Sequence, residues 1–165
     1  MPQELKLNIF MKNISTLLLL LIVTDSTIFS QTVTIGTQVW MTKNLDVATF
    51  RNGDPIPEAK TKEEWTKAGQ NKQPAWCYYD NDPANGAKYG KLYNWFAVND
   101  SRGLAPKGYH VPTESEWAKM IDFLGGKDVA GKKMKSTNGW LNNGNGTNES
   151  GFNGLPGGYA ADMDN

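Results

Sequence analysis

The sequence contains a single cysteine, Cys77, among its 165 residues. One thiol cannot form a disulfide within the chain, and it cannot supply the cysteine set of a structural zinc site. Internal disulfides therefore do not stabilise this fold. In an exported protein, an unpaired cysteine also suggests a pairing partner that the sequence does not contain.

The chain has no excess of either charge. Its 17 Lys and Arg residues balance its 17 Asp and Glu residues, and neither a basic patch nor an acidic tail is evident. Proteins that bind nucleic acids neutralise phosphates with clustered Lys and Arg side chains. Nucleic acid is therefore not an expected partner.

Long apolar runs are lacking, with one short run near the N-terminus. This run, residues 14–23, is well below the roughly 20 apolar residues that a membrane-spanning helix needs. Lys6 and Lys12 precede it, and Asp25 follows it. The arrangement is typical of a secretory signal peptide, and Ser30 supplies a small residue for cleavage.

We therefore predict a signal peptide over residues 1–30 and a single exported domain over residues 31–165. The mature protein is expected to be secreted or held at the cell surface, with no membrane segment after cleavage. Two alternatives stay open: an uncleaved membrane anchor, and a start at Met11 in place of Met1.

Aromatic residues are abundant, with six Trp, six Tyr and six Phe. Each buried ring removes about 150–250 Å² from water, so these residues can organise the core of a loop-rich domain. The alternative is that some tryptophans stack on sugar rings. The six are Trp40, Trp65, Trp76, Trp95, Trp117 and Trp140, and we expect Trp140, in an Asn/Gly-rich loop, to be exposed.

Alternating apolar and polar residues predict a hairpin over residues 32–41. Similar but shorter patterns predict strands at residues 45–50, 75–79 and 152–159. Residues 91–98 favour a short helix, because two large apolar side chains lie four residues apart.

Two T-x-x-E-W sequences, at residues 61–65 and 113–117, predict helix starts. In each capping box the threonine hydroxyl should accept from the amide three residues later, and the glutamate should bond back to the threonine amide. The first helix should end by Gly69. The second should run from about Glu114 to Leu124, where two glycines stop it.

Several segments together resemble the Fibrobacter succinogenes major paralogous (FISUMP) domain. They are VTIGTQVWMTKNLDV (33–47), RNGDPIP (51–57), AWCYYDND (75–82), YGKLYNWFAVND (89–100), RGLAPKGYHVPTESEW (102–117) and NESGFNGLPGGY (148–159). The segment HVPTESEW is also similar to a segment of formylglycine-generating, sulfatase-modifying proteins.

The resemblance implies a loop-rich α+β domain of C-type-lectin-like fold, with two or three short helices. It also implies bacterial, exported, often multi-copy surface proteins without an established activity. Family members continue to a later segment and a late cysteine, so the resemblance implies that this chain is C-terminally truncated and that the partner of Cys77 is missing.

Two loops carry candidate ligands. Asp80, Asp82 and Asn85 could bind Ca²⁺, since hard cations take oxygen ligands from tight loops. The spacing is not that of an EF-hand, and the alternative is a cluster of turns that ends a strand. No other cofactor is expected.

The second loop, residues 138–150, is rich in Asn and Gly. Its candidate ligand-binding residues are Trp140, Asn142, Asn145, Asn148 and Glu149. They would contact a glycan, an envelope polymer or a surface protein.

Cys77 and His110 could be considered as a nucleophile and its base. We expect instead a half-disulfide and a packing histidine, because no third residue that would orient the base is identifiable. The reactive cysteine pair of formylglycine-generating relatives is also absent.

Three functions remain at this stage. The first is a non-catalytic surface binding module, the second is an enzyme related to the formylglycine-generating group, and the third is a purely structural surface module. No catalytic constellation is identifiable, so the first is preferred.

Overall fold

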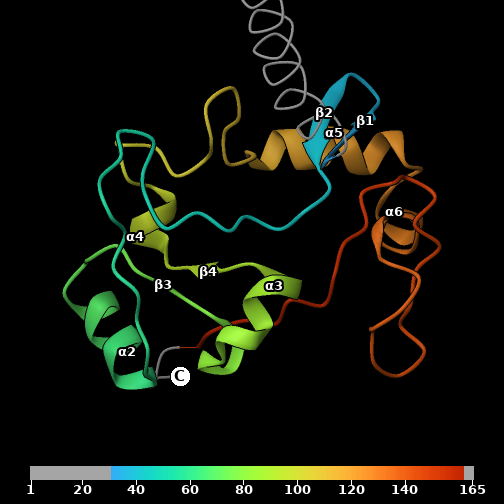
Figure 1. Cartoon of the computed structure of the whole chain (residues 1–165). Helices are drawn as coiled ribbons and strands as arrows, with labels where there is room; N and C mark the ends of the chain where they lie inside the picture. The colour runs from blue at the N-terminus through green and yellow to red at the C-terminus, as the bar shows by residue number, and fades with distance from the viewer. Residues whose placement is uncertain (1–30, 162–165) are drawn as a thin grey trace, which may run out of the picture.

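The computed structural model describes residues 31–161, which form five short α-helices, two two-stranded sheets and long connecting loops (Figure 1). The predicted loop-rich α+β class is confirmed, with five helices instead of two or three. The predicted signal peptide, residues 1–30, lies outside the described residues. The elements are β1 (Thr32–Ile35), β2 (Gln38–Met41), α2 (Lys62–Gln70), β3 (Trp76–Cys77), α3 (Gly86–Tyr89), β4 (Leu92–Tyr93), α4 (Trp95–Val98), α5 (Glu114–Phe123) and α6 (Lys127–Met134).

The predicted hairpin is present as β1 and β2. Gly36 takes a positive φ of 62° at the turn, and Ile35 pairs with Gln38 directly across it. Thr34 pairs with Val39 on the next rung, and Val33 pairs with Trp40 on the one after it. Alternation therefore places Ile35 and Trp40 on the face that packs against α5, and both are buried.

The two predicted helix starts are present as α2 and α5. At α5 the full capping box forms, because the Thr113 hydroxyl accepts from the Glu116 amide and the Glu116 carboxylate accepts from the Thr113 amide. At α2 the Thr61 hydroxyl accepts from Glu64, but the Glu64 carboxylate accepts from Lys60 and not from Thr61. The reciprocal bond predicted there is therefore wrong, because its donor is the residue before Thr61.

The strand predicted at residues 45–50 is wrong. The Tyr93 hydroxyl accepts from the Val47 amide and donates to the Val47 carbonyl, at 2.7 Å each. One side chain thus satisfies the backbone groups that a neighbouring strand would otherwise bond. The segment makes a single isolated bridge, from Thr49 to Pro55.

The other short elements are only partly as predicted. The strand expected at 75–79 is limited to β3, because the chain enters a 3₁₀ helix, Tyr79–Asn81, in which Asp80 and Asn81 take positive φ. Residues 91–98 begin as β4, antiparallel to β3, and become helical only after Asn94, whose side chain caps α4. Residues 152–159 form no strand, since positive φ at Asn153 and Gly158 breaks the extended pattern.

Three apolar clusters hold the described chain together. The hairpin cluster joins β1 and β2 to α5 and α6 through Ile35, Trp40, Met120, Leu124 and Ala130. The central cluster contains Phe50, Ile56, Trp76, Ala97 and Leu104. The α2 cluster contains Ala59, Trp65, Ala75 and Cys77. Within residues 31–161 no helix is both long enough and apolar enough to cross a bilayer.

Candidate functional site

Trp140, in the Asn/Gly loop (residues 138–150), is predicted to be exposed, and this prediction is wrong. The Trp140 indole Nε1 donates to the Ser136 hydroxyl and to the Gly154 carbonyl, each at 3.1 Å. The Lys135 ammonium lies 4.5 Å from the centre of the Trp140 ring. The ring is therefore half-buried and anchors the loop, whereas Trp95 is the tryptophan that is 66% exposed.

The loop's asparagines mostly shape its own backbone. The Asn145 side-chain oxygen accepts from the Trp140 amide at 3.0 Å, and that of Asn148 accepts from the Asn153 amide at 2.7 Å. Asn142 takes a positive φ of 54°, and both Asn142 and Glu149 are exposed. The structure thus brings Trp140 and Asn145 together, and ligand binding by this loop stays a prediction.

The proposed calcium ligands also take part in turns. The Asp82 carboxylate accepts from the Ala84 amide at 2.9 Å, and the Asn85 side-chain nitrogen donates to the Tyr79 carbonyl at 2.9 Å. Asp80 is exposed with a positive φ. Within residues 31–161, no group of three or more His, Cys, Asp or Glu side chains is arranged to hold a metal ion. Calcium binding here stays a prediction.

Cys77 and His110 lie in different environments. Cys77 is buried in the α2 cluster, where burial raises the pKa of its thiol to about 11. His110 is exposed, and its Nε2 lies 2.8 Å from a Glu116 carboxylate oxygen, so it is not the packing histidine we expected. A buried thiol with a raised pKa is a poor nucleophile.

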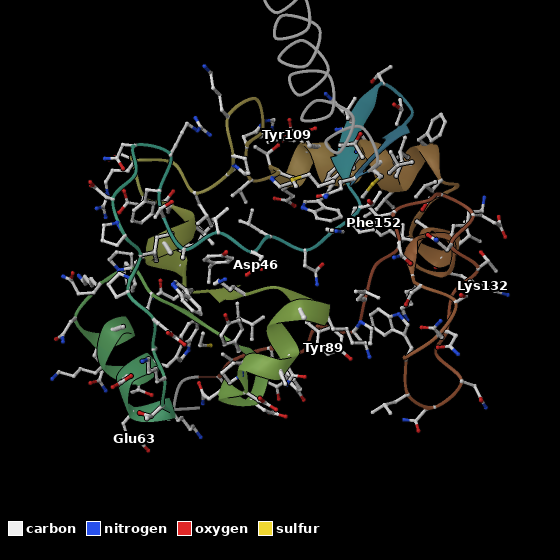
Figure 2. All side chains as sticks on the ribbon, in the orientation of Figure 1. Asp46, Glu63, Tyr89, Tyr109, Lys132 and Phe152 are labelled. Atoms are coloured by element: carbon white, nitrogen blue, oxygen red, sulfur yellow. The ribbon has the colours of Figure 1, made fainter. Side chains whose placement is uncertain are left out.

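A groove that no single sequence motif indicated lies between the hairpin and residues 104–112. Its volume is about 780 Å³, and its walls are mainly apolar. Figure 2 labels two of its lining residues, Tyr109 near the start of α5 and Phe152 below the hairpin. The lining is Gln38, Val39, Trp40, Met41, Lys43, Leu45, Tyr93, Val98, Leu104, Ala105, Pro106, Gly108, Tyr109, His110, Val111, Pro112, Glu116, Trp117 and Phe152.

Sequence reasoning missed this groove because its walls come from segments far apart in the chain. The capping box at 113–116 and the hairpin were each identifiable, but their proximity was not. A bond from the Gln38 side-chain nitrogen to the Glu116 carbonyl, at 3.2 Å, joins β2 to the first turn of α5. The tilted Trp40 and Trp117 rings, with centres 4.9 Å apart, form the wall beneath it.

Three of the polar lining residues, Gln38, His110 and Glu116, lie at the α5 end of the groove. The Glu116 carboxylate accepts from the Thr113 amide and hydroxyl, at 2.8 Å each, and lies against His110. These bonds lower the pKa of Glu116 to about 2, and the bonds from Thr113 have the largest effect. The groove therefore carries a negative charge at this end at neutral pH, beside an imidazole that can donate or accept.

This pKa shift predicts an acid-sensitive contribution to stability. The folded pKa of Glu116 lies below its ordinary value of 4.5, so its stabilising effect is complete above about pH 4.5 and is lost as the pH falls towards 2. Glu116→Gln should therefore destabilise the protein at pH 7 more than at pH 2. Urea unfolding of both proteins at several pH values measures this difference. A difference that stays constant over the range would contradict the assignment.

A second, smaller cavity of about 440 Å³ lies beside the predicted calcium loop. It is lined by Glu58, Ala59, Lys60, Tyr78, Asn81 and Pro83. Asp80, Asp82 and Asn85 do not line it. The larger groove is therefore the better candidate for a ligand site.

Comparisons with known proteins identify a family and no individual relative. The sequence model of the Fibrobacter succinogenes major domain matches residues 33–165. Comparisons with curated proteins and with solved structures gave no significant match. The matched range includes both the groove and the Asn/Gly loop. Because the match covers most of the chain, this protein belongs to the Fibrobacter succinogenes major domain family.

Proposed function

We propose that this chain is an exported, non-catalytic binding domain of lectin-like fold whose ligand occupies the groove between β2 and residues 104–112. The observation that carries the proposal is the groove's composition: mainly apolar walls with a few polar side chains, among them Gln38, His110 and Glu116. Ligand sites typically have volumes of about 300–1,000 Å³, are mostly apolar and contain a small number of orienting polar groups. The volume of about 780 Å³ lies within that range.

Export is the part of the proposal that rests on residues 1–30. The short apolar run behind two lysines supports a cleaved signal peptide. N-terminal sequencing of the protein recovered from an exporting bacterial host tests this, with Gln31 expected as the first residue. Recovery of uncleaved chain in the membrane fraction would favour the anchor instead.

Two groove residues are exposed enough to be replaced without disturbing the core. Val39 on β2 is 56% exposed, and Val111 on the opposite wall is 39% exposed. An aspartate at either position places a charge on an apolar wall, where burial by a ligand would be costly. Leu141, which is 84% exposed in the Asn/Gly loop, offers a matched control outside the groove.

We expect Val111→Asp to weaken ligand binding at least tenfold and Leu141→Asp to leave it unchanged. The wild-type chain and both variants would be screened against a glycan array and a displayed heptapeptide library, with dissociation constants measured for the hits. Binding lost on Leu141→Asp but not on Val111→Asp would move the site to the Asn/Gly loop. The absence of any hit would favour a purely structural module.

An enzyme related to formylglycine-generating proteins is the remaining alternative. Chemistry through Cys77 would need a thiolate, but burial raises the pKa of this thiol to about 11. The groove itself is not lined by Cys77. Turnover of a cysteine-containing peptide by the purified chain would support the enzyme and contradict the proposal.

A further inference from the structure

We propose that β2 accepts an extended polypeptide segment as an added strand, so that the groove's ligand is a peptide of alternating pattern. The inference rests on the proposed binding function and names the class of ligand. Strand addition of this kind uses main-chain hydrogen bonds for affinity and side-chain pockets for selectivity.

The register of the hairpin fixes which backbone groups of β2 are free. The Thr42 amide donates to the Gln31 carbonyl at 2.8 Å, and Trp40 and Gln38 are paired with Val33 and Ile35. In an antiparallel pair alternate residues bond to the partner, so the N–H and C=O groups of the residues between them point the other way. Val39 and Met41 therefore direct their backbone groups away from β1. No other group within residues 31–161 bonds to them.

That free edge borders the groove. Val39 and Met41 both line it, and residues 104–112 form its far wall. Proteins usually protect an edge strand with charges, proline or a covering segment. The sequence of β2, QVWM, has neither a charge nor a proline, and the first charged residue after it is Lys43. In Figure 1 the edge of β2 faces the loop that leads into α5.

The chemistry of this edge favours a polypeptide over a glycan. Its donors and acceptors recur every second residue, which is the spacing of a strand's own backbone groups. An added strand would place alternate side chains on the two faces of the sheet, one set towards Trp117 and the other beside the exposed Val39. The expected ligand is therefore an extended segment whose apolar side chains alternate along about four to six residues, the usual length of a strand.

The hairpin supplies its own matched pair of variants. Val39 and Thr34 face each other on one rung, and both direct their amides away from the hairpin, but only Val39 borders the groove. Proline removes a backbone N–H. Val39→Pro should therefore weaken binding of peptides selected from the displayed heptapeptide library at least tenfold, whereas Thr34→Pro should weaken it less than threefold. Melting temperatures of both variants control for damage to the hairpin.

A second measurement leaves the protein unchanged. In the best selected peptide, N-methylation of one set of alternate amides, those that bond to β2, should abolish binding. N-methylation of the other set should preserve it. Equal tolerance of both methylation patterns, or equal binding by Val39→Pro and wild type, would overturn strand addition. If Val111→Asp still abolished that binding, the groove would remain the site, and only the peptide mode would be wrong.

Two further outcomes separate this inference from its alternatives. Glycan binding that depends on Val111 but not on the Val39 amide would retain the proposed function and overturn the inference. A concentration-dependent dimer, measured by sedimentation and lost on Val39→Pro, would assign the edge to a second copy of this chain and would also overturn it. A domain that selects no peptide and no glycan would contradict both proposals.

Discussion

Replacing Phe50 with alanine should lower the free energy of unfolding by about 3–5 kcal/mol. Phe50 is 2% exposed and is the largest side chain in the central cluster to be so fully buried, so its loss removes apolar burial and leaves a cavity. The measurement is urea unfolding of the wild-type and variant chains, followed by tryptophan fluorescence and far-ultraviolet circular dichroism.

The surroundings of Phe50 should add to this loss. The Arg102 guanidinium lies 4.0 Å from the centre of the Phe50 ring and bonds to Asp54 and Asp100 at 3.0 and 2.8 Å. Removing the ring takes away the surface on which this arginine rests. Trp95→Ala, at a ring that is 66% exposed, is the control and should cost less than about 1 kcal/mol. A similar cost for both variants would contradict the assignment of Phe50 to the core.

A comparable loss, about 2–5 kcal/mol, is expected for Met120→Ala. Met120 is 0% exposed and lies in the hairpin cluster with Ile35, Trp40 and Ala130. Its side chain thus helps to hold the hairpin on α5, and the groove depends on that contact. Thermal or urea unfolding of the variant measures the loss.

Phe123 provides the control for Met120 on the same helix. It is 66% exposed, so Phe123→Ala should cost no more than about 1 kcal/mol, mainly through its contact beside Gly36. If Met120→Ala proved as mild as Phe123→Ala, the hairpin would not depend on α5 for its position. The groove proposal would then lose its structural basis.

The elements predicted correctly from the sequence are those with a local cause. The hairpin follows from alternation around Gly36, whose positive φ suits the turn. The start of α5 follows from the reciprocal bonds between Thr113 and Glu116, and its end follows from the positive φ of Gly125 and Gly126. In each case the deciding interactions lie within a few residues along the chain.

The remaining features depend on contacts that are distant in sequence. The Tyr93 hydroxyl replaces a strand partner for Val47, and Ser136 and Gly154 hold Trp140 in place. Helix α6 was missed because its apolar side chains are few among its lysines; it packs on the hairpin cluster through Ala130 and Met134. The groove also depends on contacts between distant segments, and neither of its walls contains a sequence motif that predicts a binding site.

The residues of the hairpin cluster lie far apart in the sequence, and this affects the protein during its synthesis. Trp40 is synthesised early, but the partners that cover it, Met120 and Phe152, are added about 80 and 110 residues later, which corresponds to several seconds at about 5–20 residues per second. During that interval the Trp40 indole lacks the side chains that cover it in the folded domain. The nascent chain should therefore need protection by a chaperone until its last third has left the ribosome.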